Sequence, residues 1–406
     1  MNSLDKVRFV VPEGANIDAL LAQRPLAPFD PAVIEFIERL GKALMASPQA
    51  RRHPELVALG FWARGANIKR MKDRFDAQYP DALRLARGLA FHIAPSNVDT
   101  IFVYSLLLSM LAGNVNLVRM SSRAAQQSDL LNDILKQVVE ASSERLRGII
   151  GIVRYEHDQS ITDAFSRHCD VRVVWGGDGT VELIRKSPLS PGGTELTFPN
   201  KYSLAVVDAK AWLGSDTKAT LARDFVNDSL WFGQMACSSP RALVWRGSAD
   251  DIAAASTDFW HHVEAGAREA NLGWEDAGAV AKLLAEQDNA VSVRASVVPL
   301  ETNFISVVRC PISLLGEPNG TGGGFFREFH VAALEELGAS ARRNWQTVAS
   351  FGVPKGDWQT FLLGAQPQGI DRIVPFGHAL NFNAIWDGID FLTSLTRIVV
   401  IDAPQD

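Results

Sequence analysis

Residues 88–119 read GLAFHIAPSNVDTIFVYSLLLSMLAGNVNLVR, and their pattern decides the fold class. The stretch opens with a short apolar strand, turns at 95–97 and continues as an apolar helix from Thr100. That helix is expected to end at Gly113-Asn114, because both residue types favour the left-handed conformation that terminates helices. Residues 115–119 then predict a second strand. This strand–helix–strand order is typical of a parallel sheet.

The same alternation continues through the chain. Strands are predicted at 149–153, 171–175 and 203–207, with helical segments between them. Such βαβ units build a parallel sheet that binds its ligands at the carboxyl ends of the strands. The break at 208–215 is the expected domain boundary. A second α/β lobe is predicted after it, and its elements are expected as strands at 242–245, 304–308 and 326–331 and helices at 251–270 and 331–337.

The two ends of the chain differ from this pattern. Residues from Pro31 to about Arg84 look helical, with Asp30 as the predicted N-cap. Residues 397–402 (RIVVID) predict a strand that pairs either within this chain or with a second subunit. We therefore expect four parts: a helical N-terminal segment (1–87), a cofactor-binding domain (88–210), a catalytic domain (211–380) and a C-terminal segment with a bridging or oligomerisation strand (381–406).

The composition excludes several classes of protein. The chain has 406 residues, 47% of them hydrophobic, and a net charge of −6, so it can bury large cores and does not carry the basic surface of a nucleic-acid-binding protein. The first residues lack the long apolar core typical of a signal peptide, and the most apolar run of the sequence, 101–112, is well short of the ~20 residues that span a bilayer. Three scattered cysteines fit a reducing, cytoplasmic location. The eight histidines lack metal-binding spacing, so we expect no metal.

Residues 224–245 (DFVNDSLWFGQMACSSPRALVW) contain the main chemical candidate. An amphipathic helix is predicted to end near Gly233, and a strand begins after Pro240, so Cys237 lies on the tight connection between them. Cysteine is the most nucleophilic side chain at neutral pH. The pattern alone leaves two alternatives for Cys237, a covalent nucleophile or a buried structural thiol. For Cys169 and Cys310 the structural alternative is favoured.

Two further segments carry candidate site residues. An acyl transfer to Cys237 needs two hydrogen-bond donors for the oxyanion, and we expect its backbone N–H and the side chain of Asn97 to supply them. Residues 176–180 (GGDGT) follow a strand and open a helix, so Gly176, Gly177 and Thr180 are candidates for binding a phosphate at the helix N-terminus. The alternative for this segment is a plain turn in which Thr180 or Asp178 is the N-cap.

The order of these motifs resembles the aldehyde dehydrogenase superfamily, and within it the LuxC-type acyl-CoA reductases. Residues 232–241 (FGQMACSSPR) are similar to the segment around the family's cysteine nucleophile. The blocks at 346–348, 369–377 and 386–388 resemble the carboxyl-terminal signature of the same family. The resemblance implies an aldehyde dehydrogenase-like α/β fold with two Rossmann-like lobes, and it strengthens the catalytic interpretation of Cys237.

The resemblance also implies roles for residues of the first lobe. Asn97 stands where the superfamily has its oxyanion-hole asparagine, and Gly176-Gly177 stands near its glycine-rich turn at the cofactor phosphates. Residues 117–122 stand where the superfamily holds the adenosine ribose; Arg119 replaces a lysine there and Ser122 replaces a glutamate. A glutamate would repel a 2′-phosphate, so this change favours NADPH over NADH. The expected cofactor residues in this segment are Arg119, Ser121, Ser122 and Arg123.

One departure from the superfamily bears on the direction of the reaction. Residues 196–201 (LTFPNK) resemble a segment whose glutamate activates the water that hydrolyses the thioester, and Thr197 stands in its place. Without that base a covalent thioester should persist. This suits the reduction of an acyl thioester to an aldehyde, which needs no water.

We therefore expect NADPH-dependent reduction of a long-chain fatty acyl-CoA or acyl-protein thioester through a thioester on Cys237. Two alternatives stay open: a CoA-acylating dehydrogenase of short-chain aldehydes, and an acyl-holding transferase subunit without redox turnover. The expected partners are an acyl-CoA or acyl-carrier thioester and an acyl-protein synthetase. A homo-oligomer is expected as well.

Overall fold

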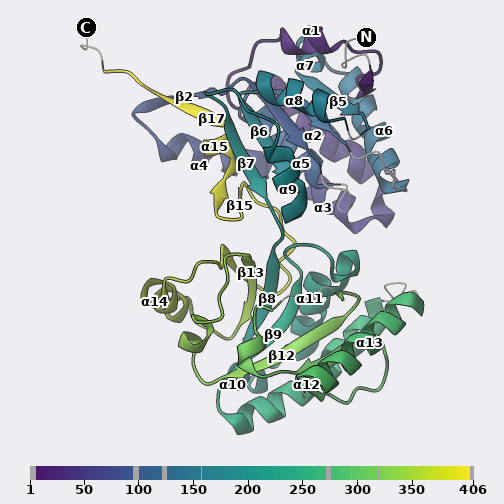
Figure 1. The fold of residues 1–406 in the computed structure, drawn as a ribbon, viewed down its shortest axis with the longest axis vertical. Coiled ribbons are helices and arrows are strands. Elements are labelled where there is room, and N and C mark those ends of the chain that lie inside the picture. Colours follow the sequence, from purple (N-terminus) through teal and green to yellow (C-terminus); the bar gives the residue numbers. More distant parts are fainter. Residues whose placement is uncertain are drawn as a thin grey trace. The chain divides into compact units, whose positions relative to one another are not determined.

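The computed structural model describes residues 6–94, 100–120, 126–156, 158–270, 276–293, 295–317 and 321–402. The chain divides into two compact units (Figure 1). Unit 1 comprises Met1–Pro199 and Phe382–Asp406, and unit 2 comprises Asn200–Asn381. The chain therefore passes between the units twice, near residues 199–200 and 381–382.

Unit 1 is built on a six-stranded sheet of order β1-β5-β4-β3-β6-β7, in which β1 alone runs antiparallel to its neighbour. Its elements in chain order are β1 (Arg8–Val11), α1 (Ile17–Leu21), α2 (Pro31–Ala46), η2 (Ala50–Arg52), α3 (Pro54–Trp62), α4 (Gly65–Gln78), β2 (Ala82–Ala86), β3 (Leu89–Ile93), α5 (Ile101–Leu111), β4 (Val115–Arg119), α6 (Gln126–Glu140), α7 (Glu144–Gly148), β5 (Ile150–Arg154), α8 (Gln159–His168), β6 (Val171–Trp175), α9 (Asp178–Arg185) and β7 (Thr194–Phe198).

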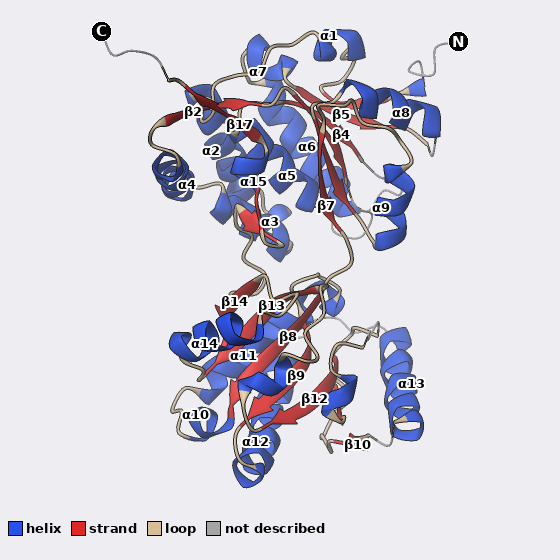
Figure 2. Cartoon of the chain, turned by 60° about the vertical axis from the view of Figure 1, so that its left-hand side comes forward, coloured by secondary structure: helices blue, strands red, loops and turns tan. Residues whose placement is uncertain are grey.

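Helices cover both faces of this sheet. Helices α5 and α6 lie on one face and α8 and α9 on the other (Figure 2). Each of the α5 residues from Phe102 to Leu111 is buried, as expected for a helix that is apolar all round. The side chain of Asp30 caps α2 by accepting the Ala32 N–H at 2.9 Å, which confirms the predicted N-cap. Strand order reverses between β3 and β6, which is where parallel α/β sheets bind ligands.

The N-terminal segment is less helical than predicted. Strand β1 pairs with β5 and so belongs to the sheet. Residues 82–86 are not the end of a helix but strand β2, which pairs antiparallel with β17 (Thr396–Val400). The predicted C-terminal strand therefore pairs within this chain. Before it the chain forms the hairpin of β15 (Ile385–Trp386) and β16 (Ile389–Asp390) and then α15 (Phe391–Ser394).

Unit 2 is built on a seven-stranded sheet of order β10-β11-β12-β9-β8-β13-β14, in which only β10 is antiparallel to its neighbour. Its elements in chain order are β8 (Tyr202–Asp208), α10 (Ala209–Leu213), α11 (Lys218–Leu230), η3 (Trp231–Gln234), β9 (Pro240–Arg246), α12 (Ala249–Ala270), α13 (Asp276–Ser292), β10 (Ser296–Val297), β11 (Ser306–Arg309), η4 (Ile312–Leu314), β12 (Phe325–Val331), η5 (Leu334–Leu337), β13 (Trp345–Phe351), α14 (Lys355–Ala365) and β14 (Arg372–Pro375).

Two apolar cores sandwich the second sheet. The first includes Trp212, Phe225 and Trp260 and packs α10, α11 and α12 against one face. The second includes Trp358 and Phe361 of α14 and covers the other face. Each fully buried side chain of this size contributes roughly 1.5–3 kcal/mol to the stability of the fold. The sheet is therefore a stable support for the loops at its edges.

Two predictions about this half of the chain differ from the structure. Strand β8, which we expected to close the cofactor-binding domain at residue 210, pairs with β9 and β13 in the sheet of unit 2. The boundary between the units therefore falls at Pro199–Asn200. The helix expected at 331–337 is the end of β12 followed by the short 3-10 turn η5.

Candidate active site

Cys237 lies on the connection between α11 and β9, as predicted. After α11 the backbone makes the short turn η3, in which Phe232, Gly233 and Gln234 all have positive φ angles, of 56°, 60° and 64°. For the two residues other than glycine this conformation costs of order 1–3 kcal/mol each. The surrounding structure must therefore hold the loop in place.

The side chain of Gln234 is the main support of this loop. It is completely buried, and its amide nitrogen donates to the carbonyl oxygens of Pro240 (3.0 Å) and Phe325 (3.2 Å). Its amide oxygen accepts the Gly324 N–H at 2.9 Å. Three hydrogen bonds thus fasten the residues before Cys237 to the starts of β9 and β12.

The glycines at 322–324 form the other half of this support. The Gly323 N–H donates to the Gly233 carbonyl at 2.9 Å. A Cβ at Gly322 would lie 2.8 Å from Met235 Sδ and 2.9 Å from the Gly233 oxygen, so only glycine fits. Gly322, Gly323 and Gly324 are all left-handed. These glycines let the backbone approach the cysteine loop closely.

The three cysteines have different surroundings. Cys169 and Cys310 are buried, whereas Cys237 is partly exposed. Burial raises the pKa of the Cys169 thiol to about 12 and also raises the pKa of Cys310. Both side chains are therefore protonated and inaccessible, as expected for structural thiols. Accessibility singles out Cys237 as the candidate nucleophile.

Two residues that the sequence did not identify contact Cys237. The amide nitrogen of Gln346, at the start of β13, donates to Cys237 Sγ at 3.3 Å. The hydroxyl of Ser203, on β8, donates to the Cys237 carbonyl at 2.7 Å. Strands β8, β9 and β13 are parallel, so this site lies at the amino edge of the second sheet. The only sequence signal for Gln346 was its place in the family-like block 346–348.

Asp228 anchors the helix that leads to this loop. It lies in the last turn of α11, and its carboxylate accepts the backbone N–H groups of Gly377 (2.8 Å) and Ala379 (2.9 Å). Burial raises the pKa of Asp228 to about 7, although the two N–H donors and the charge of Arg372 favour the ionised form. Helix α11 and the segment after β14 are thereby joined through a buried carboxyl group.

This carboxyl group should make stability depend on pH. The ordinary pKa of aspartate is 3.8, so between about pH 4 and pH 7 the folded chain keeps a proton on Asp228 that the unfolded chain has lost. The stabilisation is therefore full below pH 4 and lost by about pH 7, a change on the order of 4 kcal/mol. We expect the stability difference between the parent and Asp228→Asn to decrease over this range and to be constant above it. Urea unfolding at several pH values measures this, and a difference independent of pH would contradict it.

In unit 1 the structure brings the candidate phosphate-binding residues to the carboxyl edge of the sheet. Gly176 and Gly177 follow β6 directly, and Gly177 is the N-cap of α9, so neither Thr180 nor Asp178 is that cap. Thr180 lies in the exposed first turn of the helix. The helix N-terminus is therefore accessible to an anion.

Arg119 ends β4 at the same edge of the sheet. Its guanidinium lies over the ring of Tyr155, 4.7 Å from the ring centroid. Only β3 separates β4 from β6, so Arg119 and the Gly176-Gly177 turn flank the point where strand order reverses. The other predicted residues of this lobe lie outside the described residues: Asn97, Ser121, Ser122 and Arg123.

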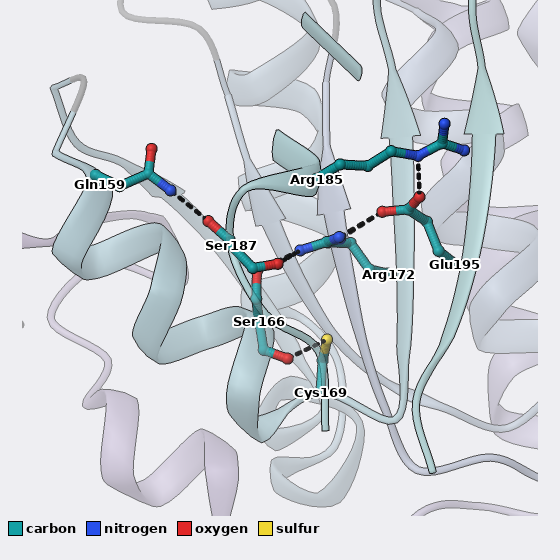
Figure 3. Close-up of polar contacts among 7 residues, drawn as sticks. All are labelled: Gln159, Ser166, Cys169, Arg172, Arg185, Ser187 and Glu195. Carbon is teal, nitrogen blue, oxygen red and sulfur yellow. Dashed lines mark hydrogen bonds and ion pairs between the residues drawn. The ribbon is translucent and has the colours of Figure 1, made fainter. Parts of the chain in front are cut away.

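The segment that resembles the superfamily's general-base region lies on β7. Thr197 is partly buried, and the one carboxylate nearby in this strand, Glu195, has another role. Figure 3 shows Glu195 between two arginines: it accepts from Arg172 Nε at 2.9 Å and from Arg185 Nε at 2.8 Å. Glu195 thus joins β6, β7 and the end of α9. A carboxylate held in this way is a structural ion pair.

Comparison with known proteins identifies the family that this chain resembles. Residues 67–265 match the model of the family described as acyl-CoA reductase (LuxC). This range includes the cysteine loop. The resemblance to the LuxC-type family is confirmed. A long-chain acyl-protein thioester reductase of Aliivibrio fischeri is 24% identical over 165 residues, which are 40% of this chain. The match covers 32% of that relative's length.

Solved structures show the fold. A lactaldehyde dehydrogenase superposes with a TM-score of 0.66 at 13% identity, covering 95% of this chain and 89% of that one. Aldehyde dehydrogenase 21 of Physcomitrella patens, in complex with succinate, gives a TM-score of 0.65 at 12% identity, covering 95% and 87%. The predicted aldehyde dehydrogenase-like α/β fold is thus confirmed. Within the described residues, we find no helix with the length and apolar character needed to cross a membrane.

Proposed function

We propose that the chain reduces a long-chain fatty acyl thioester to the aldehyde, with NADPH as reductant, through a thioester on Cys237. The observation that carries this proposal is the accessible thiol of Cys237, on a strained and firmly held loop, with an amide donor on its sulfur. The family match and the name of the Aliivibrio fischeri relative support the same substrate class. The donor is an acyl-CoA or an acyl-protein.

The covalent steps need only a thiolate and an oxyanion site. The Cys237 thiolate attacks the acyl carbonyl carbon, the bond from that carbon to the carrier sulfur breaks, and the carrier leaves as its thiol after taking up a proton. The acyl group is then a thioester of Cys237. The backbone N–H of Cys237 and the side chain of Asn97 are proposed to hold the oxyanion.

The residues of unit 1 fit a nicotinamide dinucleotide. The accessible N-terminus of α9 after Gly176-Gly177 suits a phosphate, as does the cationic side chain of Arg119 at the same edge. Thr180, Ser121, Ser122 and Arg123 complete the proposed set, and the lack of a glutamate at Ser122 favours NADPH. The cofactor, when bound, supplies the hydride that releases the acyl group as an aldehyde.

Thr197 supports the reductive direction. It replaces the glutamate of the superfamily's hydrolytic segment, and the neighbouring Glu195 is held by Arg172 and Arg185. The segment thus lacks a carboxylate available to activate water, so the thioester should survive until it is reduced.

We propose further that the enzyme is a cytoplasmic homo-oligomer that receives acyl groups from a synthetase partner. The ribbon of β2 and β17 supports the oligomer, because it exposes apolar side chains. Leu83 is 53% exposed and Val400 is 73% exposed. Exposed apolar side chains of this kind are suited to pack against a second subunit.

The experiment that tests this function is a cofactor-oxidation assay across acyl-CoA chain lengths, with NADPH and NADH side by side. We expect aldehyde formation with long-chain acyl-CoA and a several-fold preference for NADPH, because a cationic site without a competing glutamate favours the 2′-phosphate. The product is identified by mass spectrometry. Without any cofactor, the intact protein should gain the mass of one acyl group.

Two results would replace this proposal. Oxidation of short-chain aldehydes that exceeds every reductive rate would identify a CoA-acylating dehydrogenase. Acylation of the protein without any cofactor oxidation would identify an acyl-holding subunit.

A further inference from the structure

Ser203 lies between two irregularities of the second sheet. On one side, β13 pairs Trp345 with Tyr202 but Val348 with Leu204, so Gln346 and Thr347 together oppose Ser203. On the other side, the pairing of β8 with β9 is also irregular at Ser203. Such bulges re-aim side chains and are frequent beside active sites. Here the bulge on β13 lies where Gln346 reaches the thiol.

A closed circuit of hydrogen bonds holds this arrangement. The Thr347 N–H donates to Ser203 Oγ (3.2 Å), and Ser203 Oγ donates to the Cys237 carbonyl (2.7 Å). The Thr347 hydroxyl donates to Gln346 Oε1 (3.2 Å), and Gln346 Nε2 donates to Cys237 Sγ (3.3 Å). Gln346 and Thr347 are 2% and 1% exposed, so water competes little for these bonds. The circuit fixes both the backbone and the sulfur of Cys237.

We propose that Gln346 is a further catalytic residue, whose amide N–H holds the Cys237 sulfur as a thiolate, and that Thr347 sets the orientation of that amide. This inference rests on the proposed role of Cys237 as nucleophile. A donor that bonds to the charged form of an ionisable group favours that form. Because Thr347 donates to the amide oxygen, the amide nitrogen is left to face the sulfur. All of these groups belong to unit 2.

A nearby charge also acts on the ionisation of the Cys237 thiol. Arg241 on β9 interacts electrostatically with Cys237 and with Tyr202 of β8. Burial lowers the pKa of Arg241, whereas Tyr202 and Cys237 raise it. Arg241 therefore adds a cation that favours the thiolate, and it stays in place in every variant below. A change caused by Gln346 can thus be measured against a constant background.

The test is the pH dependence of alkylation of Cys237 in the full chain by iodoacetamide, without substrate or cofactor, followed by mass spectrometry of the Cys237 peptide. Only the thiolate reacts, so the midpoint of the rate profile reports its ionisation. We expect Gln346→Leu to move the midpoint up by about one pH unit, because a hydrogen bond to a charged group is lost. Gln346→Glu should move it further, because a carboxylate repels the thiolate.

Matched variants separate this effect from loss of structure. Thr347→Val removes the hydroxyl that orients the amide and should raise the midpoint by less than Gln346→Leu does. Thr347→Ser keeps the hydroxyl and should have the midpoint of the parent. Gln359→Leu makes the same chemical change at an exposed position of α14 and should leave the profile unchanged. Thermal melting verifies that each variant is folded. Midpoints of folded Gln346→Leu and Gln346→Glu equal to that of the parent would overturn the proposal.

The assay also distinguishes this inference from the proposed function. Alkylation needs no acyl donor and no nicotinamide, so a chain that reduces no thioester can still show the shift. In that case the role of Gln346 at the thiol stands and the proposed reduction fails. If the chain makes aldehyde but the midpoints do not move, the proposed function stands and the role of Gln346 fails.

Discussion

Replacing Cys237 with alanine should lower aldehyde formation at least about a thousandfold, because the variant has no sulfur to carry the acyl group. The effect should be on turnover and not on folding, since the side chain is partly exposed and the loop is held by Gln234 and the glycines at 322–324. Cys237→Ser should also be inactive, because a hydroxyl is a far weaker nucleophile than a thiolate at neutral pH. The measurement is the initial rate of aldehyde formation with saturating NADPH.

Cys310→Ala is the matched control. That thiol is buried at the end of β11, so its loss should lower stability slightly but leave both the acyl-enzyme and the aldehyde rate in place. Intact-protein mass spectrometry should show the acyl adduct in Cys310→Ala and not in Cys237→Ala. If Cys237→Ala makes aldehyde within tenfold of the parent rate, the covalent mechanism is wrong.

Much of the fold was predictable because the central parallel strands are continuous apolar runs. The strands at 115–119 and 171–175 have the predicted bounds, and both are buried in the middle of a sheet. The edge strand β7 was missed, because its sequence TELTF is polar and one of its polar residues, Glu195, pairs with Arg172. An apolar pattern identifies central strands well, but it does not identify edges.

The sequence could not say which sheet a strand joins. Strand β8 is apolar and follows β7 after only three residues, so local pattern assigned it to the first lobe. Its partners β9 and β13 lie about 35 and 140 residues further along the chain. The same limit applied to the site. The tight connection around Cys237 was readable from its neighbours, whereas Gln346 is 109 residues away and reaches the thiol through a bulge.

Replacing Glu328 with glutamine should destabilise unit 2 by about 3–5 kcal/mol, because it removes one partner of a buried ionic network. Glu328 lies on β12 and its side chain is completely buried. Oε2 accepts from the indole N–H groups of Trp260 (2.5 Å) and Trp245 (3.2 Å), and from the Ser256 hydroxyl (2.6 Å). Oε1 accepts from Arg309 (2.8 Å), with His330 as a further partner on β12. The amide of a glutamine would present donors to groups that are themselves donors.

The pH dependence gives a second, independent measure of the same network. Burial by itself would raise the pKa of Glu328, but the hydrogen bonds from His330, Ser256 and Trp260 and the charge of Arg309 lower it to about 2. The ordinary value is 4.5, so this stabilisation is full above about pH 4.5 and is lost as the pH falls toward 2. The difference in the free energy of unfolding between the parent and Glu328→Gln should therefore decrease as the pH falls from about 4.5 toward 2.

Urea unfolding followed by tryptophan fluorescence is the suitable measurement, because Trp245 and Trp260 contact the carboxylate directly. Glu335→Gln, the same change at an exposed glutamate of η5, is the control and should stay within about 0.5 kcal/mol of the parent. A Glu328→Gln variant as stable as this control would mean that the network contributes no net stability. The rigidity of the sheet beneath the cysteine loop would then have to come from the two apolar cores alone.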